Sequence, residues 1–234
     1  AGYAREAPGH RFRFVRSSSA ALAPRTLAAL EALTRAPVVE AYGMTEAAHQ
    51  MASNPLPPAR RVPGTVGRSA GAEIAIMDAE GRLVAAGERG EVVVRGPGVT
   101  AGYDGGEGSD GANARAFTAG WFRTGDEGRL DGAGYLTITG RLKEIVNRGG
   151  EKVAPREVDE ALLDHEAVAQ AVAFGVPHPT LGEDLAAAVV VTAGATADEA
   201  ALRRHLFERL AAHKVPTQIV LVDAIPKGAT GKVQ

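Results

Sequence analysis

The stretch Val38-Val39-Glu40-Ala41-Tyr42-Gly43-Met44-Thr45-Glu46 decides the fold of the first part of the chain, because an apolar run ends there in a short polar loop. Upstream of it, residues 12–15 alternate as a short strand would, and Leu27, Leu30 and Leu33 mark one face of a helix. A strand, a helix and a second strand form a unit of a parallel sheet. Two strands are too few for a stable sheet. We therefore expect preceding sequence to supply the remaining strands.

The pattern changes between residues 63 and 139 to short apolar runs separated by glycine-rich turns. Residues 73–77 and 91–94 fit strands, with turn-forming residues between them. This composition predicts a small β-rich, barrel-like subdomain. Residues 104–113 are crowded with Gly, Asp and Ser, so we expect an exposed loop there.

A separate small α+β domain is expected from residue 141. Pro155 fits the first position of a helix through residue 163, and a second helix is expected to open at Thr196, with Glu199 completing a capping box. Three strands are expected, at residues 169–174, 185–191 and 219–222. The predicted fold class is thus α/β plus α+β: a portion of a large domain over residues 1–140, divided into a sheet piece (1–62) and a β-rich part (63–139), then a hinged small domain over 141–234.

Composition narrows the function. The chain of 234 residues has a formal net charge of -2 and no run of Lys or Arg longer than two, which argues against a nucleic-acid-binding stripe or a membrane-surface helix. It has no cysteine, hence no disulfide and no thiolate nucleophile. The longest apolar run, residues 185–191, is too short to span a bilayer, and no secretory signal is visible. We expect a cytoplasmic protein.

Three motifs stand in a fixed order: Tyr42-Gly43-Met44-Thr45-Glu46, Gly120-Trp121-Phe122-Arg123-Thr124-Gly125-Asp126 and Pro226-Lys227-Gly228-Ala229-Thr230-Gly231-Lys232. Together they resemble the adenylate-forming (AMP-binding) enzymes, which join a carboxylic acid to AMP from ATP; the acyl-CoA synthetases among them then pass the acyl group to CoA. The family's phosphate loop lies upstream of the first motif, and nothing like it occurs between residues 1 and 40. The resemblance therefore implies the C-terminal half of a ligase.

The chemistry of the residues fits that activity. Thr45 could donate its hydroxyl to the α-phosphate, Glu46 offers oxygen ligands to Mg²⁺, and Tyr42 could stack on adenine. A carboxylate such as Asp126 can accept hydrogen bonds from both ribose hydroxyls, and Arg141 could reach the same ribose or a phosphate. Taken singly, these residues equally fit an ordinary polar loop, a turn Asp beside Gly125 and a solvated cation. With Ser19 and Ala20, the motif residues Gly43 and Met44 complete the expected nucleotide site.

Lys232 is the expected catalytic cation of adenylation, since a Lys on a glycine-containing loop can bridge the carboxylate and the phosphate. Gly231-Lys232 is no P-loop, because Pro226 and Val233 stand where that motif needs Gly and Ser or Thr. The resemblance implies that Lys143 is a hinge about which the small domain turns for thioester formation. It also implies a CoA-binding face, with Gly149 and Gly150 beside a pantetheine tunnel and Arg148 or Lys152 at the anionic end of CoA.

The residues after Glu46 suggest the acid. Ala47-Ala48-His49-Gln50-Met51 and Ser53-Asn54-Pro55-Leu56-Pro57 look most like the oxalyl-CoA synthetases. Oxalate brings a second carboxylate that needs donors, for which His49 and Ser19 are candidates. Malonyl-CoA and fatty acyl-CoA synthetases are alternatives, as is a non-catalytic nucleotide-binding fragment. We expect ATP, Mg²⁺ and CoA as cofactors, small-molecule substrates, and the missing N-terminal half or a second copy as partner; this chain alone is expected to be inactive.

Overall fold

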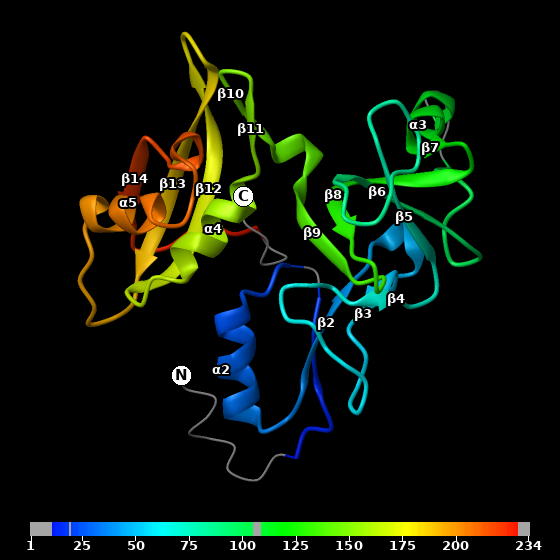
Figure 1. Ribbon diagram of the computed structural model, residues 1–234, viewed down its shortest axis with the longest axis horizontal. Coiled ribbons are helices and arrows are strands. Elements are labelled where there is room, and N and C mark those ends of the chain that lie inside the picture. The colour runs from blue at the N-terminus through cyan, green and yellow to red at the C-terminus, as the bar shows by residue number, and fades with distance from the viewer. Residues whose placement is uncertain (1–10, 19, 105–108, 229–234) are drawn as a thin grey trace. The chain divides into compact units, whose positions relative to one another are not determined.

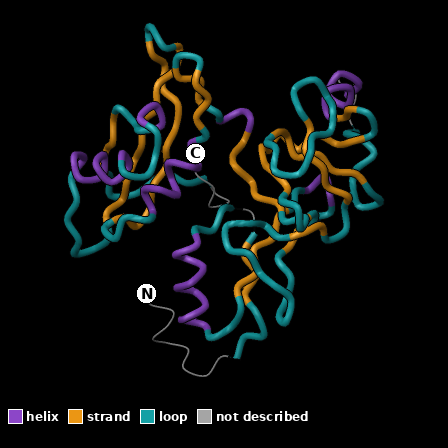
Figure 2. The backbone as a smooth tube through the Cα atoms, viewed as in Figure 1, coloured by secondary structure: helices purple, strands orange, loops and turns teal. Residues whose placement is uncertain are grey.

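The protein is described by a computed structural model covering residues 11–18, 20–104 and 109–228 (Figures 1 and 2). The chain divides into two compact units, Ala1–Ile138 and Thr139–Gln234. This division falls close to the domain boundary expected after residue 140. Within the described ranges, no helix is both long and apolar enough to cross a membrane.

The first unit opens with a four-stranded sheet in the order β1-β2-β3-β4. Its strands are β1 (Val15–Ser17), β2 (Val38–Tyr42), β3 (Ala52–Ser53) and β4 (Arg68–Ser69). β1 and β2 are parallel and joined by α2 (Pro24–Thr34), which confirms the predicted strand-helix-strand unit. The first strand lies later than predicted, however, and the side chain of Phe12 is exposed. β3 and β4 continue the sheet in antiparallel fashion.

Helix α2 buries less of its predicted face than its leucines suggested. Leu27 is buried and Leu30 half-buried, but Leu33 is 54% exposed. At 3.6 residues per turn, six positions rotate a side chain about 120° away from its starting direction. Leu33 therefore cannot share the inward direction of Leu27, and the predicted three-leucine face was wrong at this residue.

A second sheet in the first unit curls into a half-barrel, in the order β5-β6-β8-β7 with β9 paired to β8 (Figure 1). The predicted strand 73–77 is confirmed, and the predicted strand 91–94 extends by one residue at each end. Val92, Val94, Phe122 and Leu136 are fully buried and form its core. The strands are β5 (Glu73–Met77), β6 (Gly90–Arg95), β7 (Phe117–Thr118), β8 (Trp121–Leu130) and β9 (Leu136–Arg141).

The expected loop over residues 104–113 is in part a helix. α3 spans Ser109–Ala116, so the loop prediction was wrong from residue 109 onward. Ala112, Ala114 and Ala116 favour a helix, and Ala116 packs against the cluster that contains Phe122. This contact could not be inferred from the polar composition of the segment.

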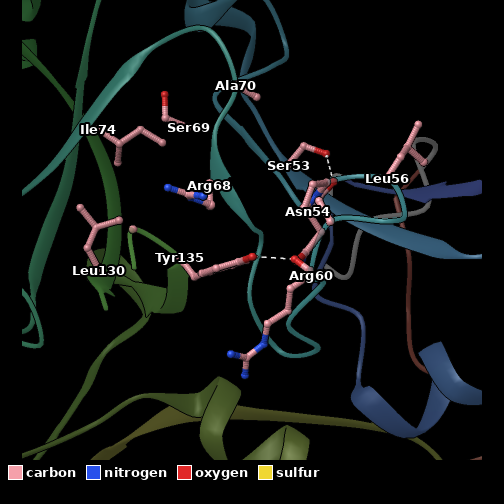
Figure 3. Close-up of a pocket in the computed structure, with 13 residues that line it drawn as sticks. Ser53, Asn54, Leu56, Arg60, Arg68, Ser69, Ala70, Ile74, Leu130 and Tyr135 are labelled. Carbon is pink, nitrogen blue, oxygen red and sulfur yellow. Dashed lines mark hydrogen bonds between the residues drawn. The ribbon is translucent and has the colours of Figure 1, made fainter. Parts of the chain in front are cut away.

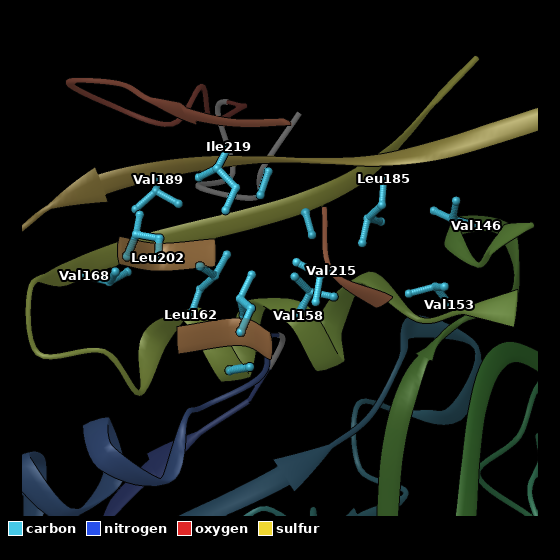
Figure 4. Packing of buried hydrophobic residues seen from close by; sticks show 14 residues of the cluster. Val146, Val153, Val158, Leu162, Val168, Leu185, Val189, Leu202, Val215 and Ile219 are labelled. Atoms are coloured by element: carbon cyan, nitrogen blue, oxygen red, sulfur yellow. The ribbon is translucent and has the colours of Figure 1, made fainter. Parts of the chain in front are cut away.

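The second unit confirms the predicted α+β domain. Its sheet has the order β11-β10-β13-β12, with β14 parallel to β13, and its core includes Leu162, Leu185, Leu202 and Leu206 (Figure 4). The strands are β10 (Val146–Arg148), β11 (Glu151–Val153), β12 (Val168–His178), β13 (Gly182–Val191) and β14 (Gln218–Leu221). The helices are η2 (Leu142–Glu144), α4 (Pro155–Leu163), α5 (Glu199–Phe207) and η3 (Ala212–Lys214).

The two long helices of this unit test the capping predictions. α4 begins at Pro155 and ends at Leu163, as predicted. α5 begins at Glu199, and its N-cap is Asp198, whose carboxylate accepts a hydrogen bond from the Ala201 amide at 2.7 Å. The predicted start at Thr196 was wrong, because an Asp two residues later supplies the acceptor that the first turn needs.

Candidate functional site

A tight turn follows β2 and carries the first motif. A Cβ atom built on Gly43 would lie 2.1 Å from the backbone oxygen of His49, so only glycine fits there. The amides of Ala47 and His49 both donate to the carbonyl of Met44, and the Met51 amide donates to the carbonyl of Tyr42. The turn thus closes on itself through backbone bonds and does not depend on its side chains to hold its shape.

The side chains of this turn are accessible. Thr45 and Glu46 lie in η1 (Thr45–Ala47), Thr45 exposed and Glu46 half-buried. Ala48 and His49 follow with φ of 51° and 58°, a left-handed conformation that costs a non-glycine residue about 1 kcal/mol or more. Such strained pairs concentrate at functional sites. The imidazole of His49 is exposed directly after this strained step.

The structure brings Tyr42 and Asp126 together from different sheets. The Tyr42 hydroxyl, at the end of β2, donates to Oδ2 of Asp126 in β8. Asp126 is 4% exposed, and its amide donates to the Thr124 hydroxyl at 3.1 Å. A buried carboxylate needs donors, and Tyr42 supplies one of them. The arrangement fixes a strong hydrogen-bond acceptor beside an aromatic ring, which suits a ligand that carries both hydroxyl groups and a flat base.

Glu91 is a supporting residue that sequence reasoning missed. Its side chain is buried in β6, pairs with Arg123 at 2.7 Å (Arg123 Nε to Oε2) and accepts the Gly125 amide at 2.9 Å. Gly125 has a φ of 72°, so Glu91 fixes the unusual backbone just before Asp126. The available signal was a Glu directly before the apolar run Val92-Val93-Val94, because a carboxylate in a strand that reads as buried needs partners.

The carboxylate of Glu46 is of the kind that can bind a Mg²⁺ ion carried by a nucleotide. Within the described residues, no three His, Cys, Asp or Glu side chains cluster as a metal site. Mg²⁺ is commonly held by one or two carboxylates together with substrate phosphates rather than by an all-protein cage. Glu46, half-buried in the turn after β2, offers one carboxylate of that kind. The Tyr103 hydroxyl donates to its Oε1 at 3.1 Å, and partial burial together with this bond raises the pKa of Tyr103.

The second unit holds the remaining candidates. Arg141 and Lys143 are exposed at the end of β9 and in η2. Gly149 and Gly150, with φ of 62° and 97°, form the turn between β10 and β11, and Lys152 is exposed on β11. These positions are thus accessible to a ligand in the small unit.

Arg148 faces inward. Its Nε lies 2.7 Å from Oδ1 of the buried Asp184, and Nη1 donates to the carbonyls of His213 and Val215 at 2.8 and 3.0 Å. Burial works against the charge of Asp184, but the Leu185 amide, the Thr217 hydroxyl and Arg148 together lower its pKa. Arg148 therefore stabilises the fold of the small unit. Of the two cations expected to contact CoA, Lys152 is the exposed one.

Ser19 and Lys232 lie outside the described residues. Ala20 is described and exposed, ahead of α2.

Comparison with known proteins decides the family. Residues 2–104 match the model for "AMP-binding enzyme", and residues 157–232 match that for "AMP-binding enzyme C-terminal domain". The chain belongs to the AMP-binding enzymes. It is 51% identical over 225 residues to a probable CoA ligase, CCL9, of Humulus lupulus, covering 96% of this chain and 42% of that protein. It is 48% identical to an oxalate–CoA ligase of Arabidopsis thaliana, covering 96% and 43%.

A solved structure agrees. ATP-bound MatB from Rhodopseudomonas palustris superposes with a TM-score of 0.87 at 36% identity, covering 95% of this chain and 44% of that one. The chain spans less than half the length of each of these three proteins.

One cavity of the first unit is lined by residues other than those expected at the nucleotide site. It has a volume of about 850 Å³, and none of the expected site residues lines it (Figure 3). Arg68 lies over the ring of Tyr135, whose hydroxyl donates to the carbonyl of Arg60 at 2.6 Å. The cavity is thus lined in part by residues 53–56, which follow the first motif in the sequence, and by none of the residues expected to bind the nucleotide.

Proposed function

We propose that the protein carrying this chain is an ATP-dependent acid–CoA ligase. It activates a carboxylic acid as acyl-AMP with release of pyrophosphate and then transfers the acyl group to CoA. The observation that carries the proposal is the pairing of Tyr42 with the buried Asp126, which joins two of the family motifs at one place. Membership of the AMP-binding enzymes supports the same reaction.

The proposed roles follow from the geometry. Tyr42 holds the carboxylate of Asp126 in place, so that carboxylate can accept a hydrogen bond from ribose while the Tyr42 ring lies against adenine. The exposed Thr45 hydroxyl can donate to the α-phosphate, and Glu46 can bind the Mg²⁺ of the nucleotide. Lys232 would supply the cation of the adenylation step. In the small unit, Arg141 would reach the ribose or a phosphate, and Gly149, Gly150 and Lys152 would bind CoA.

We further propose a small dicarboxylate, oxalate first, as the acid. Support comes from the likeness to an oxalate–CoA ligase and from the exposed imidazole of His49 beside the nucleotide turn. A second carboxylate held near this turn needs a hydrogen-bond donor, and the His49 imidazole can supply one. Malonate and fatty acids are the alternative substrates.

The test is pyrophosphate release by the complete protein with oxalate, glyoxylate, malonate, sulfoacetate and palmitate. We expect kcat/KM for oxalate to exceed that for glyoxylate, which lacks the second carboxylate, by at least about 100-fold. The variant His49→Ala should lose oxalate turnover and keep its affinity for ATP. A preference for palmitate, or unchanged oxalate kinetics in His49→Ala, would remove oxalate from first place and leave the ligase reaction standing.

The alternative of a non-catalytic nucleotide-binding fragment is tested separately. The 234-residue chain alone should release no pyrophosphate with any of these acids, whereas the complete protein should. A complete protein that binds ATP yet activates none of the acids would favour the non-catalytic alternative.

A further inference from the structure

The segment after β6 lies against the turn that carries Glu46. The Thr100 amide donates to the Glu46 carbonyl at 2.7 Å. Val99 packs against the buried cluster that contains Ala47 and Phe122. The backbone of Glu46 is therefore fixed by a segment that is distant in sequence.

The side chain of Glu46 is held by the same segment. The Tyr103 hydroxyl donates to Oε1 of Glu46 at 3.1 Å. The Tyr103 ring packs against Phe122, which is fully buried, with 6.5 Å between ring centroids. The Tyr103 side chain is 43% exposed, and this ring contact together with the hydrogen bond to Glu46 limits the positions that its hydroxyl can take.

Helix α3 fixes the backbone of Tyr103. Oδ1 of Asn113 accepts the Tyr103 amide at 2.7 Å, and Nδ2 donates to the Tyr103 carbonyl at 3.1 Å. Gly102 adopts a φ of 151°, and a Cβ there would lie 3.1 Å from the same Asn113 Oδ1. One amide side chain therefore brackets the peptide groups on both sides of Tyr103.

From these contacts we infer that Tyr103 is a positioning residue, which orients the Glu46 carboxylate for the Mg²⁺ of the bound nucleotide, and that Asn113 positions Tyr103. The inference rests on the proposed role of Glu46 as a metal ligand. A donor on Oε1 restricts the rotamers of Glu46 and leaves Oε2 for the cation. Partners of this kind typically change metal affinity by about 10-fold or more when removed.

The experiment measures metal binding directly. In the complete protein saturated with the ATP analogue that has a CH₂ group between the α- and β-phosphorus atoms, Mn²⁺ affinity is measured by electron paramagnetic resonance. Tyr103→Phe, which removes only the hydroxyl, should weaken Mn²⁺ binding about 10-fold. Asn113→Ala should weaken it in the same direction by a smaller factor. Affinity for the analogue without metal, and the melting temperature of Tyr103→Phe, should not change.

Two further variants make the outcome decisive. Tyr135→Phe is the matched control, because its hydroxyl also donates a hydrogen bond, but to the Arg60 carbonyl; it should bind Mn²⁺ as the wild type does. Glu46→Gln sets the loss expected when the ligand itself is removed. If Glu46→Gln weakens Mn²⁺ binding and Tyr103→Phe does not, the positioning role is wrong and the proposed function survives. If Glu46→Gln has no effect either, the metal role of Glu46 fails and the inference falls with it.

Discussion

At the scale of single residues, one carbon atom added at Gly43 should prevent the tight turn after β2 from forming. In Gly43→Ala the new Cβ would lie 2.1 Å from the His49 oxygen and 2.8 Å from the Gln50 nitrogen, both backbone atoms that cannot rotate away. We expect ATP affinity to fall at least about 10-fold and stability to fall by about 1–3 kcal/mol. Isothermal titration calorimetry with ATP measures the first effect and urea unfolding the second.

Gly132→Ala is the control for this change, because a Cβ there would meet nothing within 4 Å. It should bind ATP normally. Equal ATP affinity in Gly43→Ala would show that the turn rearranges on binding and that its unliganded geometry does not define the site.

The buried Asp159 should make the stability of the folded protein depend on pH. Burial raises its pKa from 3.8 to about 7, with Glu160 and Glu144 acting in the same direction and the Ala173 amide and Arg156 opposing them. Between these two pKa values the folded protein keeps a proton that the unfolded chain has released. Stability from this group is therefore fully present below the unfolded pKa and is lost as pH rises through the folded pKa.

Asp159→Asn should remove that loss. Relative to the wild type, the variant should gain about 1–3 kcal/mol at about pH 8 and almost nothing at about pH 4, as measured by urea unfolding at both values. A gain in Asp159→Asn that is equal at both pH values would contradict the raised pKa.

At the scale of elements, the start of α5 offers a direct comparison of two capping residues. Asp198→Ala removes the acceptor of the Ala201 amide and should cost about 1 kcal/mol of stability, with faster hydrogen exchange in the first turn of α5. Thr196→Ala, at the predicted cap, should be neutral. If Thr196→Ala were the more costly change, the helix would begin in solution where the sequence pattern placed it.

Elements with strong local signals were predictable. Pro155 marks the first position of α4, and the turn-forming residues that follow residues 73–77 mark the end of β5. The failures have different causes. Helix α3 forms where Ala116 packs against the cluster that contains Phe122, a contact that is distant in sequence. Leu33 and the start of α5 were local misreadings, one of helix periodicity and one of the capping residue. In the candidate site too, the sequence indicates residues that lie in a local motif, but not the contacts between residues that are distant in sequence.

The motif residues of the site could be named from the sequence, but their supports could not. Glu91 lies 34 residues from the Gly125 amide that it holds, and Tyr103 lies 57 residues from Glu46. Arg148 is the opposite case. The family resemblance implied a contact with CoA, whereas the pairing of Arg148 with Asp184 becomes visible only when β10 and β13 are adjacent. Sequence patterns mark candidate ligands, whereas their orientation depends on tertiary packing.

At the scale of the whole molecule, the expected site residues are divided between the two units. Tyr42, Thr45, Glu46 and Asp126 belong to Ala1–Ile138, whereas Arg141, Gly149, Gly150 and Lys152 belong to Thr139–Gln234. Two chemical steps that draw on different residues of the second unit would require it to take two orientations. A change of a few backbone torsions at the junction can produce such a motion. Lys143, exposed in η2 shortly after the division, is the proposed hinge.

The hinge proposal predicts opposite effects of two variants on the two half-reactions. Lys143→Pro fixes φ at the hinge, so thioester formation should fall by at least about 10-fold while pyrophosphate release is kept. Lys232→Ala removes the expected adenylation cation, so pyrophosphate release should stop while preformed acyl-AMP still reacts with CoA. Single-turnover measurements of each step in the complete protein separate the two. Since one orientation would have to serve both steps in a rigid enzyme, a parallel loss of both half-reactions in either variant would contradict a hinged small unit.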